Sequence, residues 1–394
     1  MSTTLATPAA GTASDRGTYT YIAVFSAVLY TVLLIAPVIA GKLAAQFGLT
    51  PVQLGMLFSL ELGAFSLATM PAYLWLTRMN LRTATCLFTA VVIAGNLASG
   101  FIDSFALLVA ARVITSLAAG SITVIILSLS GRTANPSRAF GIFVVFQLAM
   151  GALILAVFPM LYAGTGVAAI YWTLAGLAAL CLFVVRCIDG EALRAPAAGS
   201  STPGAPAAAG VPAKLPAGKF VLGMAAVLLF YVSLSGVWSF MAQLSAGAGI
   251  GLSASSTVLS IATVAGIVSA LVATVLGDTP RRRLFLLGGY LGMAFSVALL
   301  FGAPGLVRFA VAAVIFKFAW TFILPYLLSS LSSLGSSKHL MNTTNLMIGT
   351  GFAIGPIVCG NLIQSSGSFS GMLTLAVVGV LASLACVMGA QRRT

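Results

Sequence analysis

The chain has 394 residues, of which 60% are hydrophobic and only 6% are charged. A soluble domain carries roughly a quarter charged residues, so this composition excludes a water-soluble globular protein and predicts a polytopic membrane protein. The net charge of +13 would suit a nucleic-acid partner. However, the basic residues lie in short loops between apolar runs, which is typical of topology determinants and predicts no nucleic-acid binding.

Apolar runs near twenty residues predict an all-α fold, because barrel strands would show ten-residue alternation. We expect twelve transmembrane helices in two pseudo-symmetric six-helix bundles. The spans are expected at residues 19–40, 53–76, 83–102, 105–129, 139–162, 168–187, 219–243, 254–276, 284–302, 306–330, 340–363 and 370–390. The corresponding segments are a cytoplasmic tail (1–18), an N-terminal bundle (19–187), a flexible linker (188–218) and a C-terminal bundle (219–394).

The distribution of positive charge predicts the orientation. If both termini lie in the cytoplasm, fifteen of the 19 Lys and Arg residues fall on that side, and only Lys42 falls in an outer loop. Such a bias is typical of the positive-inside rule, so we expect a bacterial inner-membrane protein with both termini in the cytoplasm. Arg112, Arg308 and Lys317 remain within spans.

Several short motifs follow in chain order. Thr50, Pro51 and Gln53 predict a capped helix start before the second span. Two short basic loops, LTRMNLR (Leu76–Arg82) and LGDTPRRR (Leu276–Arg283), occupy equivalent places in the two halves. An internal repeat of this kind is typical of transporters whose site lies between two bundles near mid-membrane.

This layout resembles the major facilitator superfamily over essentially the whole chain. Four loop residues match that family's signature between helices 2 and 3 and its echo between helices 8 and 9, which implies gating roles: Arg78, Arg82, Asp278 and Arg281. Thr77 stands where the family has an acid. The segment RVITSLAAG, with Arg112, resembles the helix-4 motif. The segment GFAIGPIVCG resembles the hinge of drug antiporters, which implies gating by Gly355 and Pro356.

Lys317 is the most informative charge, because it lies near the middle of an apolar span, far from either membrane surface. Its helical neighbours at three and four residues are Trp320 and Thr321. An ammonium beside an aromatic ring and a hydroxyl suits an anionic, partly apolar ligand. The resemblance adds that helices 1, 4, 7 and 10 line a central cavity. We therefore expect Lys317 to bind substrate in a wet hollow; the alternative is a structural ion pair.

Two further charges lie inside spans. Arg112 stays charged at any relevant pH, so it can bind an anion or pair with an acid but cannot carry a transported proton. Glu61 is the only acid buried within a span, so it is the candidate proton carrier. Asn361 and Gln364 lie at a similar depth and are expected as its neutral partners. The alternative is an interhelical hydrogen bond or a pair with Arg112.

The remaining candidate substrate-binding positions are polar or aromatic residues within the spans. Each also has interhelical packing as an alternative explanation. Together with Lys317, Arg112 and Trp320, they are Tyr30, Tyr231, Trp238, Gln147 and Asn345.

No phosphate-binding loop, catalytic motif or metal-ligand spacing occurs, so we expect neither an enzyme nor a metal or other cofactor. We interpret the chain as a monomeric secondary active transporter that works by alternating access. Its expected cargo is a small organic anion, a carboxylate, moved with protons. One alternative is a proton-driven drug or metabolite efflux antiporter. The other is a receptor or scaffold that uses a transporter fold without transporting.

Overall fold

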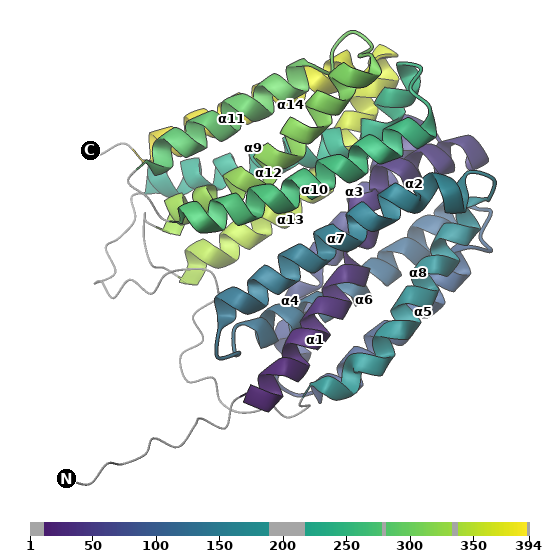
Figure 1. The fold of residues 1–394 in the computed structure, drawn as a ribbon, viewed down its shortest axis with the longest axis vertical. Coiled ribbons are helices and arrows are strands. Elements are labelled where there is room, and N and C mark those ends of the chain that lie inside the picture. The colour runs from purple at the N-terminus through teal and green to yellow at the C-terminus, as the bar shows by residue number, and fades with distance from the viewer. Residues whose placement is uncertain (1–11, 189–216, 278–280, 333–337, 392–394) are drawn as a thin grey trace.

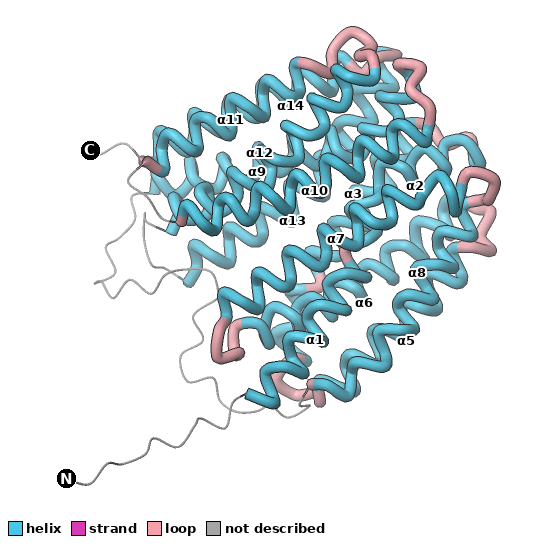
Figure 2. Tube along the Cα trace, viewed as in Figure 1, coloured by secondary structure: helices cyan, strands magenta, loops and turns pink. Residues whose placement is uncertain are grey.

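The computed structural model describes residues 12–188, 217–277, 281–332 and 338–391, and these residues form helices and no strands. The N-terminal half contains α1 (Thr12–Leu29), α2 (Thr31–Phe47), α3 (Pro51–Leu67), α4 (Thr69–Trp75), α5 (Leu81–Ser99), α6 (Phe105–Ser130), α7 (Pro136–Tyr162), α8 (Val167–Cys181) and the 3-10 helix η1 (Leu182–Cys187). The C-terminal half contains α9 (Ala217–Gly247), α10 (Leu252–Leu276), α11 (Arg282–Ala298), α12 (Leu306–Ser332), α13 (Lys338–Ser366) and α14 (Ser370–Ala390). Most loops in the described segments lie at the two ends of the bundle (Figure 2).

The expected membrane-spanning architecture is confirmed. Eleven helical segments among the described residues are long and apolar enough to cross a membrane, and α11 occupies the place of the expected ninth span. Helix α1 begins at Thr12, inside the segment expected as the cytoplasmic tail. The first span also runs beyond residue 40, to Phe47, where Gly48 ends it with a left-handed φ of 61°. Most of the expected linker lies outside the described residues.

The first two spans are interrupted, which the apolar runs did not predict. The first breaks at Tyr30, between α1 and α2, and the second at Ala68, between α3 and α4. In addition, Pro37 lies inside α2. Because proline has no backbone N–H, the carbonyl of Leu33, four residues earlier, lacks its usual helical donor.

The two halves meet along one end of the molecule (Figure 1). We call the side on which α1 begins and α14 ends the termini face, and the opposite side the far face. Helix α3 packs on α13, α7 on α10, and α2 on α9. Three hydrogen bonds cross between the halves in the far-face parts of these helices. They join Val52 N to Gln364 Oε1 (3.3 Å), Ile357 N to Ser59 Oγ (2.9 Å) and Ser260 Oγ to Ala152 O (2.7 Å). We call this set of contacts the far-face seal.

Near the termini face, the halves pack separately. Helix α1 packs on α6, α7 and α8 of its own half. One hydrophobic cluster, which includes Tyr21, Phe25 and Ile122, draws only on the N-terminal half. The main cluster instead combines Phe58 of α3 with Trp238 of α9 and so continues across the seal. The conformation is therefore closed at the far face.

Glycines allow the close approach of α3 and α13. A Cβ atom added to Gly55 would collide with the carbonyl oxygen of Pro356, and one added to Gly360 would collide with that of Pro51. Both collisions are with backbone, which cannot turn aside as a flexible side chain can. The seal therefore depends on small residues at these positions.

We expect Gly55→Leu to wedge the far-face seal open. The measurement is labelling of a cysteine at Ser260 by a membrane-impermeant maleimide, with the five native cysteines replaced by serine. Gly41→Leu is the matched control, because a Cβ atom at Gly41 meets nothing within 4 Å. The Gly55 variant should be labelled several-fold faster than the control. Equal labelling of the two would contradict this account of the seal.

Candidate functional site

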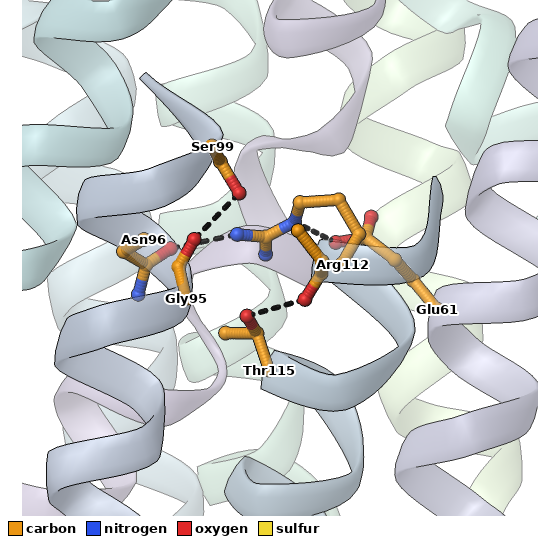
Figure 3. A network of polar contacts seen from close by, with 7 residues as sticks. Glu61, Gly95, Asn96, Ser99, Arg112 and Thr115 are labelled. Carbon is orange, nitrogen blue, oxygen red and sulfur yellow. Dashed lines mark hydrogen bonds and ion pairs between the residues drawn. The ribbon is translucent and has the colours of Figure 1, made fainter. Parts of the chain in front are cut away.

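A buried ion pair links α3 and α6 in the N-terminal half (Figure 3). Arg112 Nε donates to Glu61 Oε1, and Arg112 Nη1 donates to Asn96 Oδ1 of α5 at 2.7 Å. The guanidinium carbon lies 4.7 Å from the ring centroid of Tyr171. Arg112 is only 1% exposed and Glu61 4%. A buried charge is costly unless it is paired and hydrogen-bonded, and here the two opposite charges meet that requirement together.

Two nearby hydroxyl groups do not compete for this pair. Ser99 Oγ donates to the carbonyl oxygen of Gly95, and Thr115 Oγ1 donates to that of Ala111, each within its own helix (Figure 3). Close helix contact brings the partners together, since a Cβ atom on Gly120 of α6 would collide with the carbonyl oxygen of Phe65 on α3. Gly120 therefore lies on the face of α6 that approaches α3.

Glu61 pairs with Arg112, the alternative that the sequence left open. The expected neutral partners are wrong. Asn361 Nδ2 donates to Ile357 O in its own helix, and Gln364 Oε1 accepts from Val52 N. No described residue donates a hydrogen bond to Glu61 Oε2, and Glu61 lines a cavity. That oxygen is therefore open to water or to a proton.

The cavity beside the ion pair has a volume of about 60 Å³ and lies within the N-terminal half. Its walls include Tyr30, Leu33 and Phe65, together with Glu61 and Arg112. A water molecule needs about 10–15 Å³ of such space, so in this conformation the cavity has room for a few water molecules and not for a drug-sized ligand.

Lys317 lies in the other half and is 1% exposed. It is eleven residues into α12, which is about 16 Å along the helix axis and hence near mid-membrane. Its Nζ atom is 3.8 Å from the ring centroid of Trp320 and 4.1 Å from that of Trp238. The two rings stand edge to face, with centroids 6.0 Å apart. Gly266 of α10 makes room for the lysine stem, since an added Cβ atom would lie 3.2 Å from Lys317 Cγ.

The immediate surroundings of Lys317 are neither the wet hollow nor the structural ion pair that the sequence suggested. Within the described parts of the chain, the pair of Arg112 and Glu61 is the sole salt bridge, so Lys317 has aromatic faces rather than a carboxylate as partners. The expected wet hollow is also wrong for this conformation, because the two indole rings enclose the ammonium. The hydroxyl hydrogen of Thr321 is already used, since Oγ1 donates to the carbonyl oxygens of Gly266, Lys317 and Phe318.

The other predicted binding residues divide into two groups. Tyr231 lies near the lysine site, because its ring and that of Trp320 both contact Phe352, at centroid distances of 4.9 and 6.4 Å. Tyr30 lines the cavity near the ion pair. Gln147 of α7 has a buried Oε1 atom without a hydrogen-bond partner, whereas Asn345 is exposed on α13. The interactions of Glu61, Arg112 and Lys317 with the described residues include neither of them.

The predicted gating residues have mainly local contacts. Arg82 donates to the carbonyl oxygens of Ile188 (2.7 Å) and Arg186 (3.3 Å), which ties α5 to the end of η1 within one half. Arg78 and Arg281 are exposed, and Asp278 lies outside the described residues.

The two predicted hinge residues, Gly355 and Pro356, lie where α13 contacts both α9 and α3. A Cβ atom on Gly355 would approach the carbonyl oxygen of Val232 on α9 to 2.5 Å, and the Pro356 carbonyl faces Gly55 of α3. The pair therefore joins α13 both to its own half and to the far-face seal.

Replacing Arg112 by methionine is expected to destabilise the protein strongly, because Glu61 would remain buried without its partner. Breaking a buried pair in this way costs about 3–5 kcal/mol. The unfolding midpoint in detergent should fall, and the double variant Glu61→Met with Arg112→Met should recover much of the loss. Arg308→Met is a control, since the hydrogen bonds of Arg308 to described residues go to the loop carbonyls of Phe301 and Gly302. A midpoint unchanged in Arg112→Met would refute the role assigned to the pair.

Comparisons with known proteins agree with this architecture. The family model described as Major Facilitator Superfamily matches residues 20–344. Among solved structures, a point mutant of the nucleoside transporter NupG superposes with a TM-score of 0.73 at 12% identity, covering 95% of this chain and 98% of that one. A second structure of NupG gives a TM-score of 0.71 at 13% identity, with 96% and 100% covered. No curated protein matched in sequence. At these identities the structural likeness shows the fold alone.

Proposed function

The chain belongs to the major facilitator superfamily, and we propose that it is a proton-coupled secondary transporter of a small organic anion. In this proposal the termini face lies in the cytoplasm, because the excess of basic residues is on that side. The far-face seal then closes the outer side of the molecule. The inner side is the termini face, where the two halves pack separately. Alternating access would exchange this arrangement for its opposite around residues at mid-membrane.

The observation that carries the substrate class is the buried ammonium of Lys317 without an acidic partner in the described structure. A charge at mid-membrane is expensive and usually marks a substrate or ion pathway. Arg112 and Glu61 neutralise each other, so Lys317 leaves one uncompensated positive charge. A carboxylate would neutralise it, and the rings of Trp320, Tyr231 and Phe352 would accommodate an apolar or aromatic body.

Glu61 is the proton carrier in this proposal. It is a carboxylate in a membrane-spanning helix, it lines the cavity, and its Oε2 atom has no donor among the described residues. Arg112 keeps its charge throughout. Protonation of Glu61 would therefore weaken the ion pair and leave Arg112 as a second positive charge near the substrate. Proton loading would thus favour occupancy by an anion.

Counterflow in proteoliposomes tests the substrate class. The vesicles are loaded with an unlabelled candidate, and uptake of the labelled compound is measured with no pH gradient. Aromatic and aliphatic carboxylates should exchange, whereas cationic drugs should not. Nucleosides belong in the panel because the two similar structures are nucleoside transporters. Exchange confined to nucleosides or to cations would overturn the anion assignment. An absence of exchange for every compound would favour the receptor or scaffold alternative.

A further inference from the structure

Trp238 makes a hydrogen bond that crosses from one half of the molecule to the other. Its indole Nε1 donates to the carbonyl oxygen of Leu33 at 3.3 Å. Trp238 lies on α9 and Leu33 on α2, in the two halves that the far-face seal holds together. The tryptophan is 1% exposed, so water does not supply an alternative partner for the N–H group.

The acceptor is available because of a proline. In an uninterrupted helix, the Leu33 carbonyl would accept the N–H of residue 37, but that residue is Pro37. A buried backbone carbonyl without a partner is costly, and native structures almost always satisfy it. Here the partner comes from the opposite half, so the interruption in α2 creates a docking point for one side chain of α9.

The same indole ring is one wall of the lysine site, with Lys317 Nζ 4.1 Å from its centroid. Trp238 therefore touches the uncompensated charge with its ring face and the other half with its N–H group. Trp320, the second wall, contacts Lys317 at 3.8 Å but makes no described hydrogen bond to the N-terminal half. The three hydrogen bonds of the far-face seal involve no charged side chain.

We infer that Trp238 is a positioning residue that couples the lysine site to the far-face seal. While the ammonium lies against its ring, the indole is held with its N–H aimed at Leu33, and the halves stay closed at the far face. Because both rings cover the ammonium, an anion can reach it only if a ring turns away. Turning Trp238 breaks the bond to Leu33 and weakens the seal. The anion in this last step rests on the proposed function; the coupling itself does not.

Two chemically different substitutions test this coupling from opposite sides. Trp238→Phe keeps an aromatic ring but removes the donor, whereas Pro37→Ala keeps the tryptophan and supplies a backbone N–H that competes for the Leu33 carbonyl. Both should raise maleimide labelling of the cysteine at Ser260 from the far face. An increase of roughly two- to tenfold is the population change that one hydrogen bond supports. The Pro37 variant regains a helical hydrogen bond and should therefore fold.

Two matched controls accompany these variants. Trp320→Phe alters the other wall of the lysine site, and Pro159→Ala removes a different proline inside a helix, α7. Both should be labelled at the parent rate. Parent-rate labelling of Trp238→Phe or Pro37→Ala, or equal increases in the controls, would overturn the inference.

Labelling of Lys317 variants tests whether Lys317 acts on the seal through Trp238. Lys317→Met should raise labelling as well, because the ring of Trp238 loses the cation that orients it. If one mechanism underlies both effects, the double variant Lys317→Met with Trp238→Phe should be labelled no faster than Trp238→Phe alone. Additive increases would show that the two residues act independently. Labelling needs no substrate, so this result stands whether or not the anion assignment holds.

Discussion

Replacing Lys317 by methionine is expected to abolish binding of an anionic substrate while leaving the protein folded. Methionine keeps much of the unbranched stem beside Gly266 and removes a charge that is enclosed by two indole rings. Removing one partner of a buried charge pair costs about 2–5 kcal/mol or more, which corresponds to a loss of affinity of about 30-fold to several thousand-fold. Removing an uncompensated ammonium from the membrane interior should not lower stability.

The measurement is counterflow of a labelled carboxylate, combined with the unfolding midpoint in detergent. Lys42→Met is the matched control, because Lys42 donates to the loop carbonyls of Ala163 and Thr165. Its counterflow should equal that of the parent. Affinity retained in Lys317→Met would rule out the lysine as the anion-binding group.

Glu61→Gln is expected to separate exchange from accumulation. Glutamine offers an acceptor oxygen to Arg112 Nε but cannot release a proton. Counterflow, which needs no net proton movement, should stay within a few-fold of the parent. Accumulation driven by an imposed pH gradient should fall at least about tenfold, to the level of equilibration, because a neutral amide cannot replace a group that takes up and releases a proton.

The control for this second variant is Asp103→Asn, which changes a carboxylate in the far-face loop before α6. Its accumulation should not change. Normal pH-driven accumulation by Glu61→Gln would assign the proton to another group. Loss of counterflow together with accumulation would instead indicate a structural role for the pair.

Features set by local sequence were predictable. Length and apolarity gave the spans, and Thr50 forms the expected capping box, with its side chain accepting from Gln53 N and the Gln53 side chain accepting from Thr50 N. Helical spacing placed Trp320 beside Lys317. The pairing of Glu61 with Arg112 was one of two alternatives, because opposite charges at similar depth in the second and fourth spans can meet only if those two helices are neighbours.

Contacts between segments that are distant in the chain could not be predicted from the sequence. Trp238 was a candidate for the cavity, but its position against Lys317 depends on how α9 packs with α12. The enclosure of Lys317 and the location of the cavity beside Arg112 depend on which face of the molecule is closed. One signal was available: Pro37 inside an apolar span frees the Leu33 carbonyl, although it does not say which donor will take it.

The most direct test of the account is whether a proton moves with the anion. Proteoliposomes in weakly buffered medium would receive a membrane-impermeant carboxylate selected by counterflow, while uptake and external pH are recorded together. We predict that the medium becomes more alkaline as the carboxylate enters, and that Glu61→Gln vesicles and protein-free vesicles show no such change. Carboxylate uptake with no proton movement would contradict the account, as would transport that Lys317→Met leaves intact.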